Sequence, residues 1–185
     1  MSSGQMAQNE RFNRLFQVSE FYYFKILRST DIAGQHPVID RAAAYWRNKC
    51  RDQGLPARAD IRPEEIRHLL PHLALLDVIP DKVDVRLHTR LIGTHVTRYF
   101  GEITGRDIRD MENEDASERI YHMSSLAMAD RAPVLSRVRG FAPDKEHLEA
   151  LALYCPLGHP ESDDIAMIMA CITVDFVSER DMQDR

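Results

Sequence analysis

Apolar positions near the end of the chain recur with the two-residue period of β-strands. Residues 134–141, 148–157 and 165–177 form three such segments, and short turns containing Pro, Gly and Asp separate them. In 165–177 both alternating faces are apolar, which is the pattern of a strand covered on both sides. The sequence therefore predicts three consecutive strands, the last of them central in its sheet with a layer against each face.

Two further strands are predicted in the middle of the chain. Residues 73–79 are a short apolar run that contains one acid, Asp77, and a Pro-Asp-Lys turn leads into 83–92, where apolar and polar residues alternate. This alternation places Leu91 on the apolar face and Arg90 on the polar face. We expect Arg90 to form an ion pair there, either with Asp77 or with an acid of an upstream helix.

Helical periodicity predicts three helices around this sheet, at residues 37–54, 60–70 and 115–131. The first two begin near a proline, which suits the first helical turn. Trp46, the only tryptophan, is expected to be a core anchor rather than a platform for a substrate. The predicted buried stripes are Ile39, Ala42, Ala43, Trp46 and Cys50 on the first helix, and Ile120, Met123, Ala127 and Met128 on the last.

The N-terminal segment contains a further predicted helix. Residues 1–9 are polar, whereas residues 10–27 carry apolar and aromatic residues on one helical face. Such a helix packs either on its own domain or against a second subunit, and the aromatic content favours a homodimer contact because aromatics are enriched in interface cores. A membrane-surface helix is the weaker alternative, because its three basic residues are mixed with acids.

Residues 90–111 begin at the end of the strand predicted at 83–92, lie before the helix predicted at 115–131, and contain Gly93, Gly101 and Gly105. Glycines this close together allow sharp reversals, since glycine adopts positive φ without steric cost. The apolar residues between the reversals are too many for a solvated loop. We therefore expect several short helices laid over the sheet, which together line an internal cavity.

The order of these elements resembles that of a PAS domain, an α+β fold in which a five-stranded antiparallel sheet cups a small-molecule cavity beneath short helices. The resemblance rests on Leu-Ile-Gly-Thr at 91–94, Phe-Gly at 100–101 and the Gly-Arg-Asp-Ile-Arg-Asp run at 105–110. It implies short helices on one face of the sheet and the N-terminal helices on the other. The expected domains are a tail with an amphipathic helix at 1–36, a PAS-like domain at 37–178, and a tail at 179–185.

Four shorter motifs resemble one bacterial PAS subfamily, common in alphaproteobacteria, whose members are often small stand-alone proteins. They are Ala-Tyr-Trp-Arg at 44–47, Asp-Ile-Arg-Pro at 60–63, Leu-Leu-Pro-His-Leu at 69–73 and Arg-Leu-Ile-Gly-Thr at 90–94. His88 stands where such members are expected to carry an aromatic residue. The partner of the outer sheet face is therefore expected to differ here.

Composition narrows the possible functions. The 185 residues suit one domain, and the net charge of −5 without a basic half argues against a nucleic-acid partner. Cys50, Cys155 and Cys171 have no Cys-x-x-Cys spacing, which argues against disulfides or zinc and fits a reducing compartment. The sequence shows no signal peptide and no apolar stretch of membrane-spanning length, so we expect a cytoplasmic protein.

Each cofactor that a PAS-like cavity could hold requires a particular residue, which can be looked for in the sequence. Haem needs an inward histidine, but His122 points away from the apolar stripe of its helix and His95 is placed as a polar cap. A covalent flavin adduct needs a cysteine in the short-helix region, which has none; a non-covalent flavin stays open. Pro71 separates His68 from His72, which argues against a metal site, and no catalytic motif is present.

The remaining prediction is a binding module without catalytic activity. The expected ligand-binding residues are Val96, Tyr99, Phe100, Ile108, Ile120, Met123, Ala127, Met167 and Met169. The alternative is that these side chains fill the cavity completely. The expected function is a stand-alone PAS-type sensory or regulatory module in bacterial signalling, acting through a small apolar ligand, through a signalling-protein partner, or both. A small-molecule carrier or an enzyme on a similar α+β cup is the alternative.

Overall fold

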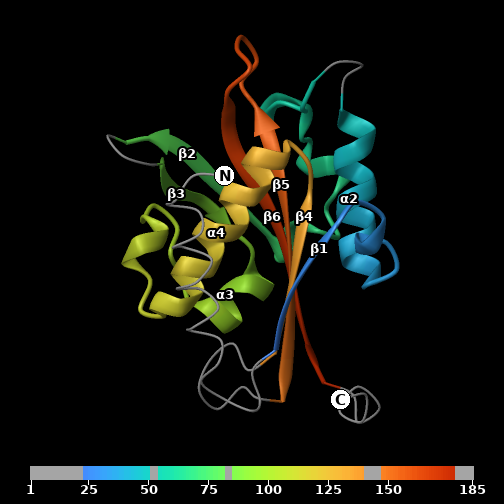
Figure 1. Ribbon diagram of the computed structural model, residues 1–185, viewed down its shortest axis with the longest axis vertical. Helices are drawn as coiled ribbons and strands as arrows, with labels where there is room; N and C mark the ends of the chain where they lie inside the picture. Colours follow the sequence, from blue (N-terminus) through green and yellow to red (C-terminus); the bar gives the residue numbers. More distant parts are fainter. Residues whose placement is uncertain (1–22, 51–53, 82–84, 140–146, 178–185) are drawn as a thin grey trace.

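The computed structural model describes residues 23–50, 54–81, 85–139 and 147–177, and its strands form one antiparallel sheet (Figure 1). The six strands lie side by side in the order β1-β4-β5-β6-β2-β3. They are β1 (Tyr23–Arg28), β2 (Leu73–Pro80), β3 (Val85–Ile92), β4 (Val134–Arg139), β5 (Leu148–Gly158) and β6 (Ile165–Phe176). The predicted α+β class is confirmed, and β6 lies in the middle of the sheet as its two apolar faces indicate.

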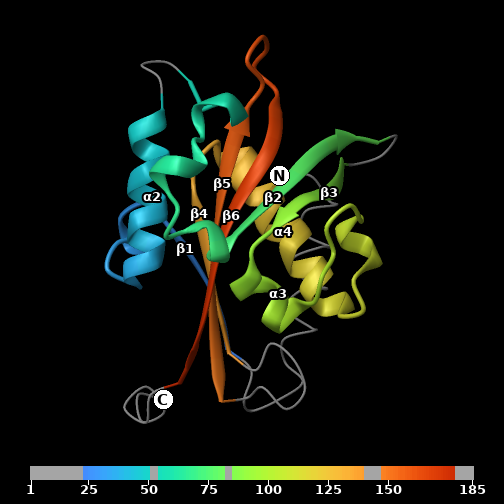
Figure 2. The same cartoon turned by 180° about the vertical axis from the view of Figure 1, so that it is seen from behind.

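Helices cover both faces of this sheet, as predicted (Figures 1 and 2). The helix α2 packs on one face against β5 and β6, whereas α3, α4 and the short helix η5 pack on the other. The helices are α2 (Pro37–Lys49), α3 (Thr94–Phe100) and α4 (Glu114–Asp130), with 3-10 turns η1 (Ser29–Ile32), η2 (Arg58–Asp60), η3 (Pro63–Glu65), η4 (Leu70–His72) and η5 (Ile108–Asp110). In the described part of the chain, no helix has the length and apolar character needed to cross a membrane.

The helix predicted at residues 10–27 is wrong over its C-terminal part. Residues 23–28 are the edge strand β1, which pairs with β4 in a register from Tyr23 opposite Arg139 to Arg28 opposite Val134. The sheet therefore has six strands rather than five. The dense run of aromatic and aliphatic residues fits the period of a helix as well as that of a strand. The open edge of β4 favours the strand, because it offers unpaired backbone groups to residues 23–28. Residues 10–22 lie outside the described residues.

The helix predicted at residues 60–70 is also wrong. The structure instead has the separate 3-10 turns η2, η3 and η4. Pro63 fits a first helical turn, but Pro71 disfavours helical dihedral angles at Leu70, so about two turns at most are left between the two prolines, and so short a helix is marginal. Ile66 and Leu69 are nevertheless buried, which ties the irregular segment to the core beneath α2.

Side chains of β5 and β6 alternate between two cores. The pocket-side core lies between the sheet and helices α3 and α4, and the α2-side core lies between the sheet and α2. On these two strands the pocket-side core receives Ala150, Ala152, Tyr154, Ile168, Ala170 and Ile172, and the α2-side core receives Leu151, Leu153, Cys155, Met167, Met169 and Cys171. The sheet thus connects the two cores directly, residue by residue.

Trp46 anchors α2 to the sheet, which confirms the prediction for this residue. Its side chain is buried, and its indole N–H donates a hydrogen bond of 2.8 Å to the carbonyl oxygen of Pro156 in β5. The helix starts at Pro37, with the His36 side chain capping the Val38 N–H at 3.1 Å. It ends at Lys49, earlier than the predicted Gly54.

A β-bulge changes which residues of β3 face inward. Leu75 pairs with Leu91 but Leu76 pairs with Thr89, so Arg90 is an extra residue in the ladder. Thr89 consequently points into the pocket-side core, and Leu91 is 41% exposed on the opposite face. The predicted inward position of Leu91 is wrong for this reason, whereas the ion pair of Arg90 with Asp77, 3.0 Å from Nε to Oδ1, is confirmed.

The glycines of residues 90–111 serve two different needs. Gly101 and Gly105 have φ of 80° and 78°, a region that favours glycine, as predicted. Gly93 has an ordinary φ of −78°. A Cβ on Gly93 would collide with the carbonyl oxygens of Leu70 and Pro71, so this position needs glycine because two backbone segments meet there.

Replacing Gly93 by alanine is expected to lower the free energy of unfolding by about 3 kcal/mol or more, because neither backbone segment can move without breaking the Gly93 N–H bond to Leu73. Urea unfolding measures the change. The matched control is Gly54→Ala, where an added Cβ meets nothing within 4 Å. Equal stability of the two variants would contradict the close approach.

Candidate ligand cavity

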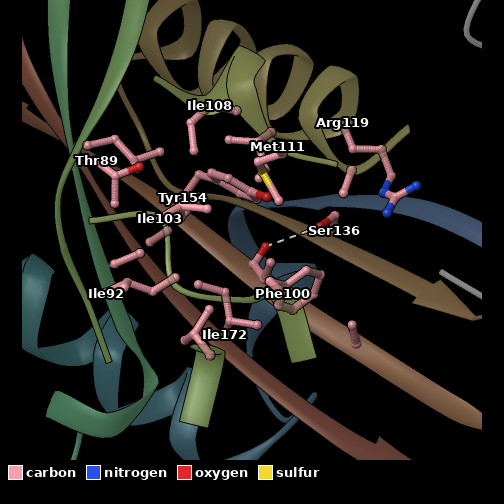
Figure 3. A pocket seen from close by; sticks show the side chains of 18 of the residues that line it. Thr89, Ile92, Phe100, Ile103, Ile108, Met111, Arg119, Ser136, Tyr154 and Ile172 are labelled. Carbon is pink, nitrogen blue, oxygen red and sulfur yellow. Dashed lines mark hydrogen bonds between the residues drawn. The ribbon is translucent and has the colours of Figure 1, made fainter. Parts of the chain in front are cut away.

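The pocket-side core contains a cavity between the sheet and the short helices (Figure 3). Its volume of about 70 Å³ is several times the roughly 10–15 Å³ that one water molecule needs. The helical wall consists of Val96, Phe100, Ile103, Ile108, Met111, Ala116 and Ile120, and the strands contribute Ala74, Leu76, Ile92, Val138, Ala150, Ala152, Ala170 and Ile172. Most of the surface around the cavity is therefore apolar.

Four of the nine predicted ligand-binding residues line this cavity, namely Val96, Phe100, Ile108 and Ile120. Met123 and Ala127 are fully buried in the same core but are not among its lining residues, and Tyr99 lines a neighbouring outer groove. Met167 and Met169 lie on the other side of the sheet, in the α2-side core. These two were placed on the wrong face because alternation groups residues without showing which group faces which helix.

The floor of the cavity was missed at the sequence level. Ala74, Ala150, Ala152 and Ala170 come from three adjacent strands, and Ala74 pairs directly with Ala170. Alanine is depleted in strands, so four alanines on one face of a sheet could have indicated this floor from the sequence. Their small side chains leave the space that bulkier residues would fill.

Three polar side chains gather at one end of the cavity, namely those of Arg119, Ser136 and Tyr154 (Figure 3). Arg119 projects from α4 and is only 6% exposed. Ser136 of β4 donates a long hydrogen bond of 3.4 Å to the Ala152 carbonyl oxygen. Burial raises the pKa of Tyr154 to about 12, against the opposing influence of the Arg119 charge and the Ser136 hydroxyl, so Tyr154 carries its proton at neutral pH.

Thr89 brings a fourth polar group to the cavity wall, on the opposite side from Arg119 in Figure 3. Its side chain is fully buried, and its hydroxyl oxygen has no hydrogen-bond partner in the described part of the chain. A buried hydroxyl without a partner is costly. A molecule in the cavity could supply that partner.

An outer groove of about 360 Å³ adjoins the cavity. Phe100, Ile103 and Met111 line both spaces, so these three side chains form the partition between them. Methionine is flexible and adapts its shape readily. Movement of these three side chains would connect the outer groove with the cavity.

The histidines considered for haem lie away from the cavity lining. His95 packs its ring on His72, with centroids 4.3 Å apart, and its Nε2 accepts a bond of 3.3 Å from the Val174 N–H. Burial lowers the pKa of His95 and, separately, that of the half-buried His122. Among the residues described, no group of three or more His, Cys, Asp or Glu side chains is arranged to hold a metal ion.

Asp107 fixes the helical wall to the edge of the sheet. Its carboxylate accepts hydrogen bonds from Arg86 Nε at 2.9 Å, from the Arg109 N–H at 2.9 Å and from the Tyr121 hydroxyl at 3.0 Å. The Tyr121 oxygen in turn accepts the Leu87 N–H at 2.9 Å. Burial raises the pKa of Asp107, but these donors outweigh it and hold the pKa below its usual value.

Asp107→Asn is expected to lower the free energy of unfolding by about 1–3 kcal/mol at pH 7, because it removes a charged acceptor from three donors. The folded pKa is lowered, so in the wild type this contribution is present above about pH 4 and is lost as the pH falls further. Urea unfolding between pH 3 and 7 measures the loss of stability and its pH dependence. The control, Asp110→Asn at an exposed site, should retain the wild-type pH profile; a retained profile in Asp107→Asn would contradict the role of the carboxylate.

A solved structure described as "Structure of an RNA-binding Light-Oxygen-Voltage Receptor" is similar at a TM-score of 0.48 and 15% identity, covering 85% of this chain. This chain spans only 39% of that structure's length. No curated protein sequence matches the chain.

A family model for the PAS domain matches residues 34–172. The match includes α2, the helical wall of the cavity and the strands β2 to β6 as far as Ile172. The chain therefore belongs to the PAS domain family.

Proposed function

We propose that this PAS domain is a sensory module that binds a small, largely apolar molecule in the cavity and relays its presence to a signalling partner. The observation that carries the proposal is an apolar cavity, floored by alanines, whose wall presents the buried Thr89 hydroxyl, which has no hydrogen-bond partner among the described residues. A core with no guest gains nothing from such a space, because voids forfeit packing contacts. The proposal assigns the chain no catalytic step.

The relay is proposed to run through the sheet to α2. Ala150, Ala152 and Tyr154 face the cavity, and the residues between them on β5, Leu151 and Leu153, pack beneath α2. A guest that displaces β5 would therefore act on both cores at once. A population shift would require only that the two cores have two packing states that bind the guest with different affinity.

We also propose that the finer features expected from the sequence belong to this function: a bacterial signalling context, membership of the alphaproteobacterial subfamily, no nucleic-acid partner, and a homodimer formed through the N-terminal segment. The aromatic residues of 10–22 support the homodimer. These residues lie immediately before β1, the edge strand of the sheet.

The cavity is tested with hexan-1-ol, a neutral chain of seven non-hydrogen atoms, at roughly 1–10 mM, the range expected for so small a ligand. It is expected to raise the melting temperature and to change the fluorescence of Trp46, which contacts β5. Ala170→Leu, which fills the floor, should abolish both effects. Ala166→Leu, on the same strand but beside the α2-side core, should retain them. Binding that survives in Ala170→Leu would contradict this site.

Removal of residues 1–22 is expected to convert the homodimer into a monomer, which sedimentation velocity measures. The circular dichroism spectrum of the variant should match that of the full chain. The cut leaves β1 in place, because a longer deletion would also remove a strand of the sheet. The control replaces Phe12 and Phe16 by serine in the full chain, which should weaken the dimer in the same direction. If both variants still sediment as the full chain does, the proposed dimer contact is contradicted.

A further inference from the structure

We infer that the ligand is an uncharged molecule with a carbonyl group, which accepts a hydrogen bond from the Thr89 hydroxyl while the hydrocarbon part fills the cavity. This inference rests on the proposed function, because it assumes that the cavity is the binding site. It adds to that function the chemical class of the ligand and the residue that recognises it.

The backbone around Thr89 fixes the position of its hydroxyl. The Thr89 N–H donates to the Arg106 carbonyl oxygen at 2.9 Å, and the Gly105 N–H donates to the Thr89 carbonyl oxygen at 2.7 Å. Threonine is β-branched, which restricts the rotation of its side chain on a fixed backbone. The hydroxyl is therefore a preformed group on the cavity wall, and it has no hydrogen-bond partner among the described residues.

The other polar side chains that line the cavity are already engaged. Ser136 donates to the Ala152 carbonyl oxygen at 3.4 Å, Tyr154 has a hydrogen bond with Ser136, and Arg119 interacts with a further group. Arg119 and Ser136 also lie across the cavity from Thr89 (Figure 3). The polar group of a guest is therefore expected at Thr89.

The surroundings of Thr89 favour an uncharged guest. Among the described residues that line the cavity, Arg119 is the only charged one, and its interaction with another group leaves it no claim on a ligand. Burial of an ionised group without an opposite charge costs far more than one hydrogen bond to a hydroxyl recovers. Cations and anions are both disfavoured for this reason.

The hydroxyl of Thr89 favours an acceptor over a second hydroxyl. If the guest is an alcohol, one hydrogen bond joins two O–H groups, and one of the two hydrogens is left without an acceptor. A carbonyl oxygen brings no hydrogen of its own, so the Thr89 O–H is satisfied and no donor is left over. Since a buried donor without an acceptor is costly, a ketone should bind more tightly than the matching alcohol.

A water molecule is the simplest competitor for the Thr89 hydroxyl. Buried waters typically make about three hydrogen bonds to polar groups. Thr89 supplies one, whereas its neighbour across the β2–β3 ladder, Leu76, is an apolar lining residue. A water at this position is therefore weakly held, and its displacement by a carbonyl group is favourable.

The test compares hexan-2-one, hexan-2-ol and hexan-2-amine, which share one carbon skeleton and carry a carbonyl, a hydroxyl and a cationic ammonium group, by isothermal titration at about pH 7.5. The ketone is expected to bind about tenfold more tightly than the alcohol, and the amine more weakly than both. Infrared spectroscopy of carbonyl-labelled hexan-2-one should show its C=O stretch at lower frequency when bound than in an alkane, as a hydrogen-bonded carbonyl requires.

Variants of Thr89 assign that bond to its hydroxyl. Thr89→Val keeps the side-chain shape, and it is expected to weaken hexan-2-one binding about tenfold and to remove the infrared shift. Thr89→Ser restores a hydroxyl and should restore the shift. Thr94→Val, at an exposed position outside the cavity lining, is the matched control and should bind hexan-2-one as the wild type does.

The outcomes separate the two levels of the proposal. If the alcohol or the amine binds the wild type as tightly as the ketone, or if the bound ketone shows no infrared shift, the carbonyl ligand is overturned and the sensory cavity stands. The same holds if Thr89→Val binds the ketone with wild-type affinity. If none of the three compounds binds the wild-type protein, both are overturned.

Discussion

The carboxylate of Asp107 is the contact on which the arrangement of the site depends. It holds η5 through the Arg109 N–H, β3 through Arg86, and α4 through Tyr121, so one buried anion joins three elements that are distant in sequence. With the wall fixed at this point, Ile108 is held over the sheet and the cavity retains a defined roof. A strongly bonded carboxylate suits this task, because its several acceptor sites meet donors from different directions.

The cavity follows from unequal side-chain size on the two layers. The helical wall is made mostly of large apolar residues, whereas the floor includes four alanines on three neighbouring strands. On the far side of the same strands the residues are large and packed beneath Trp46 and α2. One face of the sheet is therefore tightly packed beneath α2, and the opposite face leaves space for the cavity. The strand β5 contributes side chains to both faces.

Much of the fold is readable from the sequence. The strands β2 to β6 and the helix α4 were predicted with boundaries close to those observed, and α2 was predicted with its start, because their apolar positions keep one period over many residues. The two faces of β6, the anchor role of Trp46 and the Arg90–Asp77 pair were likewise predicted. The prediction failed at 23–27, where aromatic residues fit both the strand and the helix period, and at 60–70, where Pro63 and Pro71 leave room for about two helical turns at most.

The sequence by itself determined the order of elements, the alternation along the strands and the glycine-rich wall. Only the tertiary structure decided which face of β6 meets the cavity, and so moved Met167 and Met169 to the opposite core. It also decided, through the bulge at Arg90, that Thr89 faces inward and Leu91 outward. The polar end around Arg119 has the same origin: its members lie on α4, β4 and β5, and periodicity within one element holds no information about which side chains of other elements it will meet.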